Sequence, residues 1–269
     1  MSSPSTTHDH TGADQAVAGP SRYRRPVPFG RLILVHRRIW RAQKGVVAGA
    51  LVALLAGLLG VAATMATLSG PVTIAAVAAR FAGFPTVGFS LLWLAVGAIA
   101  AAAPFKSGWA VVVLSVAPVR GRWLAACFVS FALLTTAVTA LFAALAFVVT
   151  VVVLAAKGHD AGAAVGIGRS AGLVLVLVLV QAGVGFLLGA ATRSVTASII
   201  IGYVVAPILP LARIGSVDLG RWLDLDGGLT ALSSAHPSGL ALLSALTAVA
   251  LWVSVPTLVA WSRLRSSLA

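Results

Sequence analysis

The chain has 269 residues, of which 59% are hydrophobic and only 9% are charged, and its formal net charge is +13. This composition lies outside the range of soluble globular domains. The sequence contains one cysteine, Cys127, which excludes an internal disulfide framework and a cysteine-rich metal site.

The first 44 residues divide into a polar tail and a basic amphipathic segment. Residues 1–25 have little apolar surface to bury, so we predict a disordered cytoplasmic tail. Residues 26–44 predict a connecting helix that lies in the headgroup layer of the membrane. Its apolar arc consists of Phe29, Leu32, Ile33, His36, Ile39 and Trp40, and its basic residues are Arg31, Arg37, Arg38 and Arg41. We expect it to anchor to lipid, either alone or while also contacting a cytoplasmic partner.

Six apolar stretches without Asp, Glu, Lys, Arg or His follow this segment. They cover residues 45–68, 86–104, 124–154, 170–191, 195–212 and 239–260. Each is about as long as a bilayer core requires, since ~20 helical residues span ~30 Å. We therefore predict an all-α polytopic membrane protein, with a six-helix transmembrane domain over residues 45–265.

The distribution of the basic residues predicts the orientation. Of the 19 Lys and Arg residues, an alternating topology places 14 on the side of both termini and five on the other side. Because Lys and Arg favour cytoplasmic segments, both termini are predicted to be cytoplasmic. The positive charge then reflects topology and anionic membrane lipids, and it does not indicate nucleic-acid binding. The absence of Glu and the Arg-, Ala-, Gly- and Val-rich composition suggest the plasma membrane of a bacterium.

The connection between the second and third spans has a distinctive pattern. After Lys106, the apolar part from Trp109 to Ala117 is too short to cross a membrane. Pro118 ends it, and Arg120 and Arg122 follow. We expect a short cytoplasmic-side helix, a proline break and a basic turn. The alternative is a second span that extends past a kink at Pro104.

The fourth span carries a repeat of polar and small residues on one helical face. Gln181, Gly185 and Gly189 recur every four residues. Glycines at this spacing allow helix backbones to approach closely. The face is therefore interpreted as a helix-packing surface, or alternatively as part of a substrate path or a dimer seam.

Residues for catalysis are not evident. The chain has no phosphate-binding glycine loop, no paired-histidine metal motif and no nucleophile elbow. We therefore expect neither an enzyme nor a cofactor bound by this chain. The charge-free spans also argue against an ion-driven carrier, which usually needs ionisable groups near the membrane midplane.

Over residues 25–265 the chain resembles the membrane subunits of type-2 ABC exporters. The resemblance rests on the pattern VVVLSVAPVRGRWLAACF at Val111–Phe128, on six spans after a basic amphipathic helix, and on a long loop before the last span, which ends in the basic Trp261–Arg265 segment. It implies a second permease subunit, identical or different, and cytoplasmic ABC ATPase subunits that bind the ATP. It also implies that two stretches couple to the ATPase: the connecting helix, and the residues Lys106, Trp109, Pro118, Arg120 and Arg122.

The expected function is therefore that of an ATP-driven exporter permease for a hydrophobic or amphipathic substrate, such as a drug, antibiotic, peptide or lipid. An uncharged pathway disfavours the desolvation of an ion. Two alternatives stay open: a non-transporting membrane scaffold or immunity protein, and a secondary carrier.

Overall fold

A computed structural model describes residues 27–67, 84–110, 120–156, 165–205, 208, 219–225 and 238–266. Within these ranges the chain is almost entirely helical and contains no strand. The predicted all-α fold is therefore confirmed. The predicted tail over residues 1–25 and Pro118 of the predicted proline break lie outside the described ranges.

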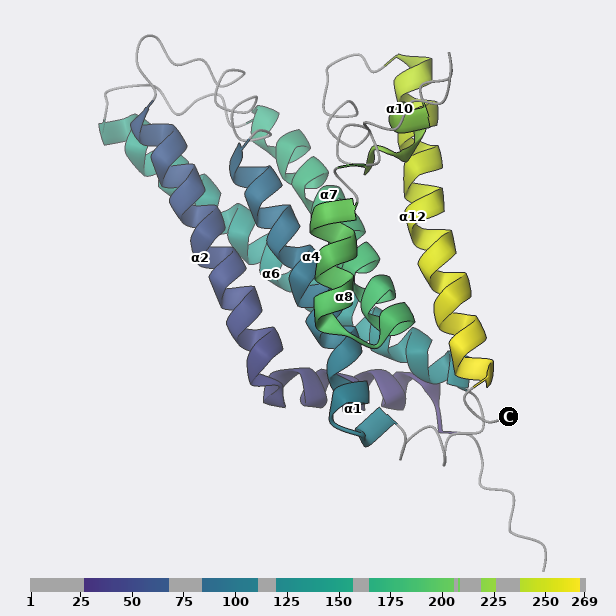
Figure 1. Ribbon diagram of the computed structural model, residues 1–269. Coiled ribbons are helices and arrows are strands. Elements are labelled where there is room, and N and C mark those ends of the chain that lie inside the picture. Colours follow the sequence, from purple (N-terminus) through teal and green to yellow (C-terminus); the bar gives the residue numbers. More distant parts are fainter. Residues whose placement is uncertain are drawn as a thin grey trace, which may run out of the picture.

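The connecting helix forms where the amphipathic pattern predicts it. Helix α1 (Phe29–Ala42) starts after Pro28, whose carbonyl accepts hydrogen bonds from the amides of Arg31 and Leu32. It ends at Gln43, which has an extended backbone, and α2 (Lys44–Ala66) begins one residue later. This break lets α1 lie across one end of the bundle, while α2 runs along the bundle (Figure 1).

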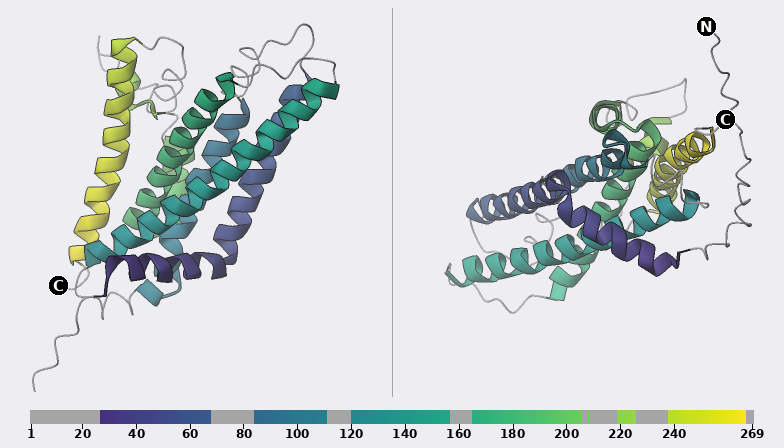
Figure 2. Two further views of the ribbon diagram at one scale, coloured as in Figure 1. Left: turned by 180° about the vertical axis from the view of Figure 1, so that it is seen from behind. Right: turned by 90° about the horizontal axis from the view of Figure 1, so that it is seen from below.

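Five helices are long and apolar enough to cross a membrane. They are α2, α4 (Phe84–Lys106), α6 (Arg120–Ala156), α7 (Val165–Thr192) and α12 (Gly239–Ser266). They coincide with the first, second, third, fourth and sixth predicted spans. With 37 residues, α6 is about 55 Å long, so it must tilt to fit a ~30 Å core. It runs obliquely across the bundle (Figure 2).

The fifth predicted span, residues 195–212, is described only in part. Helix α8 (Val195–Ile200) passes into η1 (Ile201–Val205), a π-helical turn, and together they cover 11 residues. At ~1.5 Å per residue this is about half the membrane thickness. The six-span count therefore stays a prediction. The short helix α10 (Leu219–Leu223) lies beside α12, at the end of the bundle away from α1 (Figure 1).

Helices α4 and α7 form the centre of the bundle. In their most apolar windows, 61% of α4 and 72% of α7 are buried, against 22–28% of α2, α6 and α12. The outer helices instead expose large apolar side chains, including Leu59 on α2, Val152 on α6 and Leu258 on α12. Such apolar surface is unusual on a soluble protein and ordinary on a lipid-facing helix. The helices therefore fit a multi-pass membrane protein.

The connection after α4 bears on the two alternatives for this segment: a short separate helix, or a second span that extends past a kink at Pro104. Helix α4 continues through Pro104 to Lys106, so Pro104 does not end the span. The break comes at Gly108, whose φ of 72° is in the left-handed region that favours glycine. A new helical segment then begins at Trp109 and Ala110, and residues 111–119 lie outside the described ranges.

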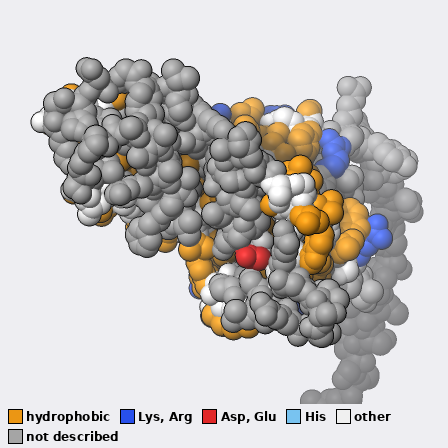
Figure 3. All heavy atoms as spheres, turned by 90° about the horizontal axis from the view of Figure 1, so that it is seen from above, with side chains coloured by type: hydrophobic (Ala, Val, Ile, Leu, Met, Phe, Trp, Pro, Cys, Tyr) orange, Lys and Arg blue, Asp and Glu red, His pale blue; other side chains and the backbone are white. Residues whose placement is uncertain are grey.

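Basic residues gather at the end of the bundle that α1 covers. Eleven of the thirteen Lys and Arg residues in the described ranges lie there: Arg31, Arg37, Arg38, Arg41, Lys44, Lys106, Arg120, Arg122, Arg193, Arg263 and Arg265. We call this the basic end. The opposite end, seen in Figure 3, has much apolar surface among its described residues and holds Asp224, the one acidic residue of the described ranges.

Candidate functional site

Helix α1 is attached to the bundle by its apolar side. The side chains of His36 and Trp40 are buried, whereas Arg31, Arg37, Arg38 and Arg41 are exposed. The imidazole of His36 lies between two indoles, with ring-centroid distances of 6.3 Å to Trp109 and 5.9 Å to Trp123. Both contacts are edge-on, a favourable geometry for aromatic rings. His36 therefore links α1 to the segment after α4 and to the start of α6.

The surroundings of His36 favour its neutral form. Burial lowers the pKa of the imidazole below its usual value of 6.5, and the hydrogen bond from Nδ1 to the carbonyl oxygen of Leu32 opposes this shift in part. The Nδ1–Leu32 distance is 2.7 Å, which holds the ring against its own helix. Within the described residues, no group of His, Cys, Asp or Glu side chains could hold a metal ion. His36 thus packs between the rings of Trp109 and Trp123.

An aromatic chain leads from α1 into the centre of the bundle. Trp40 meets Phe131 of α6 edge-on at 6.1 Å. Phe131 in turn stacks on Phe186 of α7 at 5.5 Å and contacts Trp93 of α4 at 6.3 Å. All four side chains are at least 98% buried. Buried rings therefore connect α1, through Phe131 of α6, to the two central helices.

Sequence reasoning did not identify this chain of rings. Each aromatic residue is unremarkable in its own helix, and the signal is only their arrangement across four helices. Trp40 was placed on the apolar arc of the connecting helix, but its partner Phe131 on α6 was not anticipated. Some spans contain aromatic residues near the end that contacts α1. This is the one feature of the sequence that could have suggested the aromatic chain.

Two arginines cap the C-terminal end of α12. An Nη atom of Arg120 donates to the carbonyl oxygen of Leu264 at 2.6 Å, and an Nη atom of Arg193 donates to that of Arg263 at 3.0 Å. These carbonyls belong to the last turn of α12, which carries the negative end of the helix dipole. The guanidinium of Arg193 also lies 5.2 Å above the ring of Phe105. The capping role of Arg120 differs from the ATPase-coupling role that the resemblance implies for it.

The remaining residues implied by the resemblance lie at the basic end, in different settings. Arg122 is partly buried and donates a long hydrogen bond, 3.4 Å, to the carbonyl oxygen of Val27. Lys106 is exposed at the end of α4, and Trp109 is half-buried against His36. Between Arg120 and Arg122, Gly121 faces the ring of Trp261, which would lie 2.5 Å from an added Cβ. The start of α6 therefore contacts α1 and α12 together.

Gln181, Gly185 and Gly189 lie on the face of α7 that meets α4. A Cβ at Gly185 would lie 2.0 Å from the carbonyl oxygen of Leu94, and one at Gly189 would lie 2.6 Å from that of Ala98. On the opposing helix, a Cβ at Gly97 would lie 2.3 Å from the carbonyl oxygen of Ala182 on α7. Gln181 is 2% exposed in the same layer. The backbones of the two helices are thus in direct contact here.

The described residues thus form an exposed basic surface over a stack of buried aromatic contacts. No protein-family model matches this chain, and a search among curated proteins finds no match either.

Proposed function

We propose that this chain is the membrane-spanning permease subunit of an ATP-driven ABC exporter, powered by a separate cytoplasmic ATPase and paired with a second permease subunit. One observation carries the proposal. The two stretches that the resemblance assigns to ATPase coupling come together at the basic end, where His36 of α1 lies between Trp109 and Trp123. Stretches far apart in sequence thereby form one surface.

Side-chain contacts connect this surface to the centre of the bundle. The His36 contacts attach α1 to both sides of the connection between α4 and α6, and Trp40 contacts Phe131 in the centre of the bundle. A helix held by rings on one side moves with its neighbours as a unit. ATP-driven closure of a partner against α1 would therefore act on α4, α6 and α7 together.

The face of α1 that is open to a cytoplasmic partner is basic. At 100° per residue, Arg31 and Arg38 lie about 140° and about 160° from the centre of the apolar arc, and both are exposed. Lys106 is exposed at the same end. We infer that an ATPase docks here through an acidic surface, because complementary charge steers and orients such contacts.

The substrate is proposed to be hydrophobic or amphipathic. Every Lys and Arg of the five long helices lies within the first or last few residues of its helix, so their interiors are uncharged. A passage between such helices would not replace the hydration shell of an ion. In this proposal the orientation is that of a bacterial plasma membrane protein, with the basic end in the cytoplasm.

The test is co-expression with a candidate ABC ATPase, such as one encoded beside this gene, followed by co-purification and measurement of ATP hydrolysis and substrate export. The double variant Arg31→Gln/Arg38→Gln is expected to lose the complex and the export. Lys44→Gln/Arg265→Gln removes the same charge from exposed positions at the same end and should retain both. Export driven by an ion gradient without any ATPase would instead establish a secondary carrier. An unchanged cellular phenotype after deletion of the ATPase would favour a scaffold or immunity protein.

A further inference from the structure

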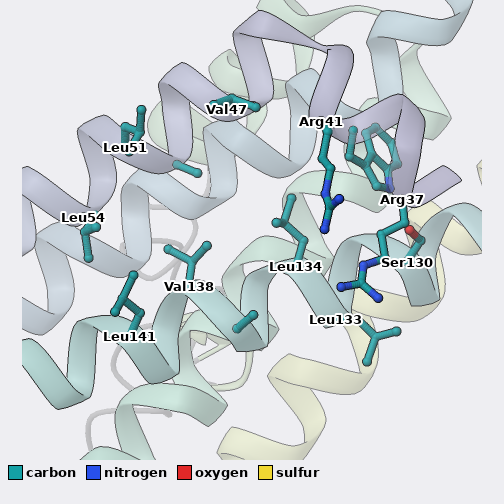
Figure 4. Close-up of a pocket in the computed structure, with 13 residues that line it drawn as sticks. Arg37, Arg41, Val47, Leu51, Leu54, Ser130, Leu133, Leu134, Val138 and Leu141 are labelled. Atoms are coloured by element: carbon teal, nitrogen blue, oxygen red, sulfur yellow. The ribbon is translucent and has the colours of Figure 1, made fainter. Parts of the chain in front are cut away.

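A groove of about 510 Å³ opens between α1, α2 and α6, below the arginines that flank the apolar side of α1. Its volume lies within the range of small-molecule sites. Val47 to Leu54 of α2 and Ser130 to Leu141 of α6 form its two walls, and Trp40, Arg37 and Arg41 close it at the basic end. Figure 4 shows Arg37 and Arg41 extending from α1 toward α6, with Leu133 and Leu134 beside them.

The length of the groove matches one leaflet of a bilayer. Its α2 wall covers seven residue steps and its α6 wall covers eleven, which correspond to about 10 Å and about 16 Å of helix. Half of a ~30 Å hydrocarbon core is about 15 Å. An occupant that starts at α1 and follows the groove would therefore end near the membrane midplane, as an acyl chain does.

The entrance of the groove is cationic and has no internal counter-charge. Arg37 and Arg41 lie one helical turn apart on α1, and both are exposed. Among the residues that the structure describes, the sole acidic one is Asp224, at the opposite end of the bundle. Two guanidinium groups above an apolar channel are chemically complementary to a phosphate that carries a hydrocarbon chain.

Two residues that line the groove each carry a buried polar atom without a partner among the described residues. The Oγ of Ser130 and the Nε1 of Trp40 have no hydrogen-bond partner among the described residues, although their side chains are only 1% and 2% exposed. A buried polar group without a partner is costly, so such groups usually bind something. Both atoms have less than 1 Å² of accessible surface, so the direct contacts to a phosphate come from the exposed Arg37 and Arg41.

We propose that this groove binds one anionic phospholipid of the inner leaflet, with its phosphate on Arg37 and Arg41 and an acyl chain between α2 and α6. The lipid would fill the space beneath α1 and fix the height of this helix in the membrane. The inference rests on the membrane placement of the bundle and is independent of the transport function. The uncharged Leu and Val walls accommodate the acyl chain of a lipid with any headgroup. Selectivity for an anionic lipid therefore comes from the two arginines.

The experiment is native mass spectrometry of the full chain, after reconstitution in bilayers that contain phosphatidylcholine and phosphatidylglycerol. We expect wild type to retain one phosphatidylglycerol molecule preferentially. Arg37→Gln/Arg41→Gln should lower this retention by roughly tenfold for each guanidinium lost, since each charge-assisted hydrogen bond contributes about that factor. Arg31→Gln/Arg38→Gln changes the net charge equally on the other side of α1 and should retain the lipid.

A second variant tests the apolar part of the site without changing charge. Ala137 is exposed and lines the groove on α6, so Ala137→Phe fills the acyl position and leaves the core intact. It should also expel the lipid. Equal losses in both arginine double variants, or equal retention of phosphatidylcholine, would overturn the proposal in favour of general attraction to the membrane. A change of oligomeric state in Ala137→Phe without lipid loss would identify the groove as a protein interface. Because none of these variants is read through an ATPase, failure here leaves the transport proposal standing.

Discussion

The guanidinium of Arg120 donates a hydrogen bond to the backbone carbonyl of Leu264, although 144 residues separate the two. The N-terminus of α6 lies beside the C-terminus of α12 in space, and this contact joins the two helices at the basic end. Arg193 makes the equivalent contact with the neighbouring carbonyl of Arg263. The last helix is therefore held by side chains from two earlier parts of the chain.

Removing the Arg120 contact should loosen α12. We expect Arg120→Ala to lower the free energy of unfolding by about 1.5–3 kcal/mol, because a charged hydrogen bond and a favourable helix-dipole contact are both lost. Thermal unfolding in detergent measures the effect. Arg122→Ala is the matched control, since its long hydrogen bond to Val27 should contribute less than about 1 kcal/mol. Equal destabilisation by both substitutions would contradict the capping role.

The contact between α4 and α7 should not tolerate a single added methyl group at its closest point. A Cβ at Gly185 would lie 2.0 Å from the carbonyl oxygen of Leu94, so the helices must separate. Gly185→Ala is expected to cost about 3 kcal/mol or more, the upper end of overpacking effects. Gly172→Ala on the same helix is the control, because nothing lies within 4 Å of its added Cβ. Unfolding midpoints of the two variants in one detergent provide the comparison, and similar midpoints would refute the close contact.

Phe131 should be the most sensitive position of α6. It contacts Trp40, Trp93 and Phe186, and it is 1% exposed. We expect Phe131→Ala to cost about 3–5 kcal/mol, the range for a large cavity. Leu133 lies two residues away and is 53% exposed, so Leu133→Ala should be close to neutral. Faster proteolysis within α1 of the Phe131 variant would show that the loss reaches the connecting helix.

The attachment of α1 should weaken at acidic pH. Burial lowers the pKa of His36 below 6.5, so the unfolded chain binds more protons than the folded one as the pH falls through that value. The contribution of neutral, buried His36 to the free energy of unfolding is therefore complete above about pH 6.5 and decreases below it. Limited proteolysis and thermal unfolding between about pH 7.5 and pH 5 should show this trend. His36→Phe retains an aromatic ring between Trp109 and Trp123, and its stability should depend less on pH; an unchanged pH dependence would exclude His36 as the cause.

The sequence predicts the individual helices well because their signal is local. Long apolar runs without charge define α2, α4, α6, α7 and α12, and the structure extends most of them by a few residues into flanking basic positions. Lys106 and Arg265 can lie at the ends of their helices with the charged group at the membrane surface. The length of an apolar run therefore underestimates the length of the helix. The fifth span is described only in part, and its described residues 195–205 include a π-helical turn.

The relationships between helices could not be predicted in the same way. The four-residue spacing of Gly185 and Gly189 indicated close packing, but nothing in the sequence identified Leu94, Ala98 and Gly97 as the opposing residues. The role of Arg120 was likewise hidden, since its acceptor is a backbone carbonyl, which every residue possesses. Partners of this kind are set by the crossing of two helices, and that geometry depends on the whole bundle.

The glycine contacts of α4 and α7 also limit how the bundle can change shape. With backbone against backbone at Gly97, Gly185 and Gly189, neither helix has intervening side chains that could change rotamer and let it slide past the other. The pair behaves mechanically as one rod. If the chain transports a substrate as proposed, its gate would form along α2, α6 or α12, and the central pair would serve as the fixed axis about which those helices turn.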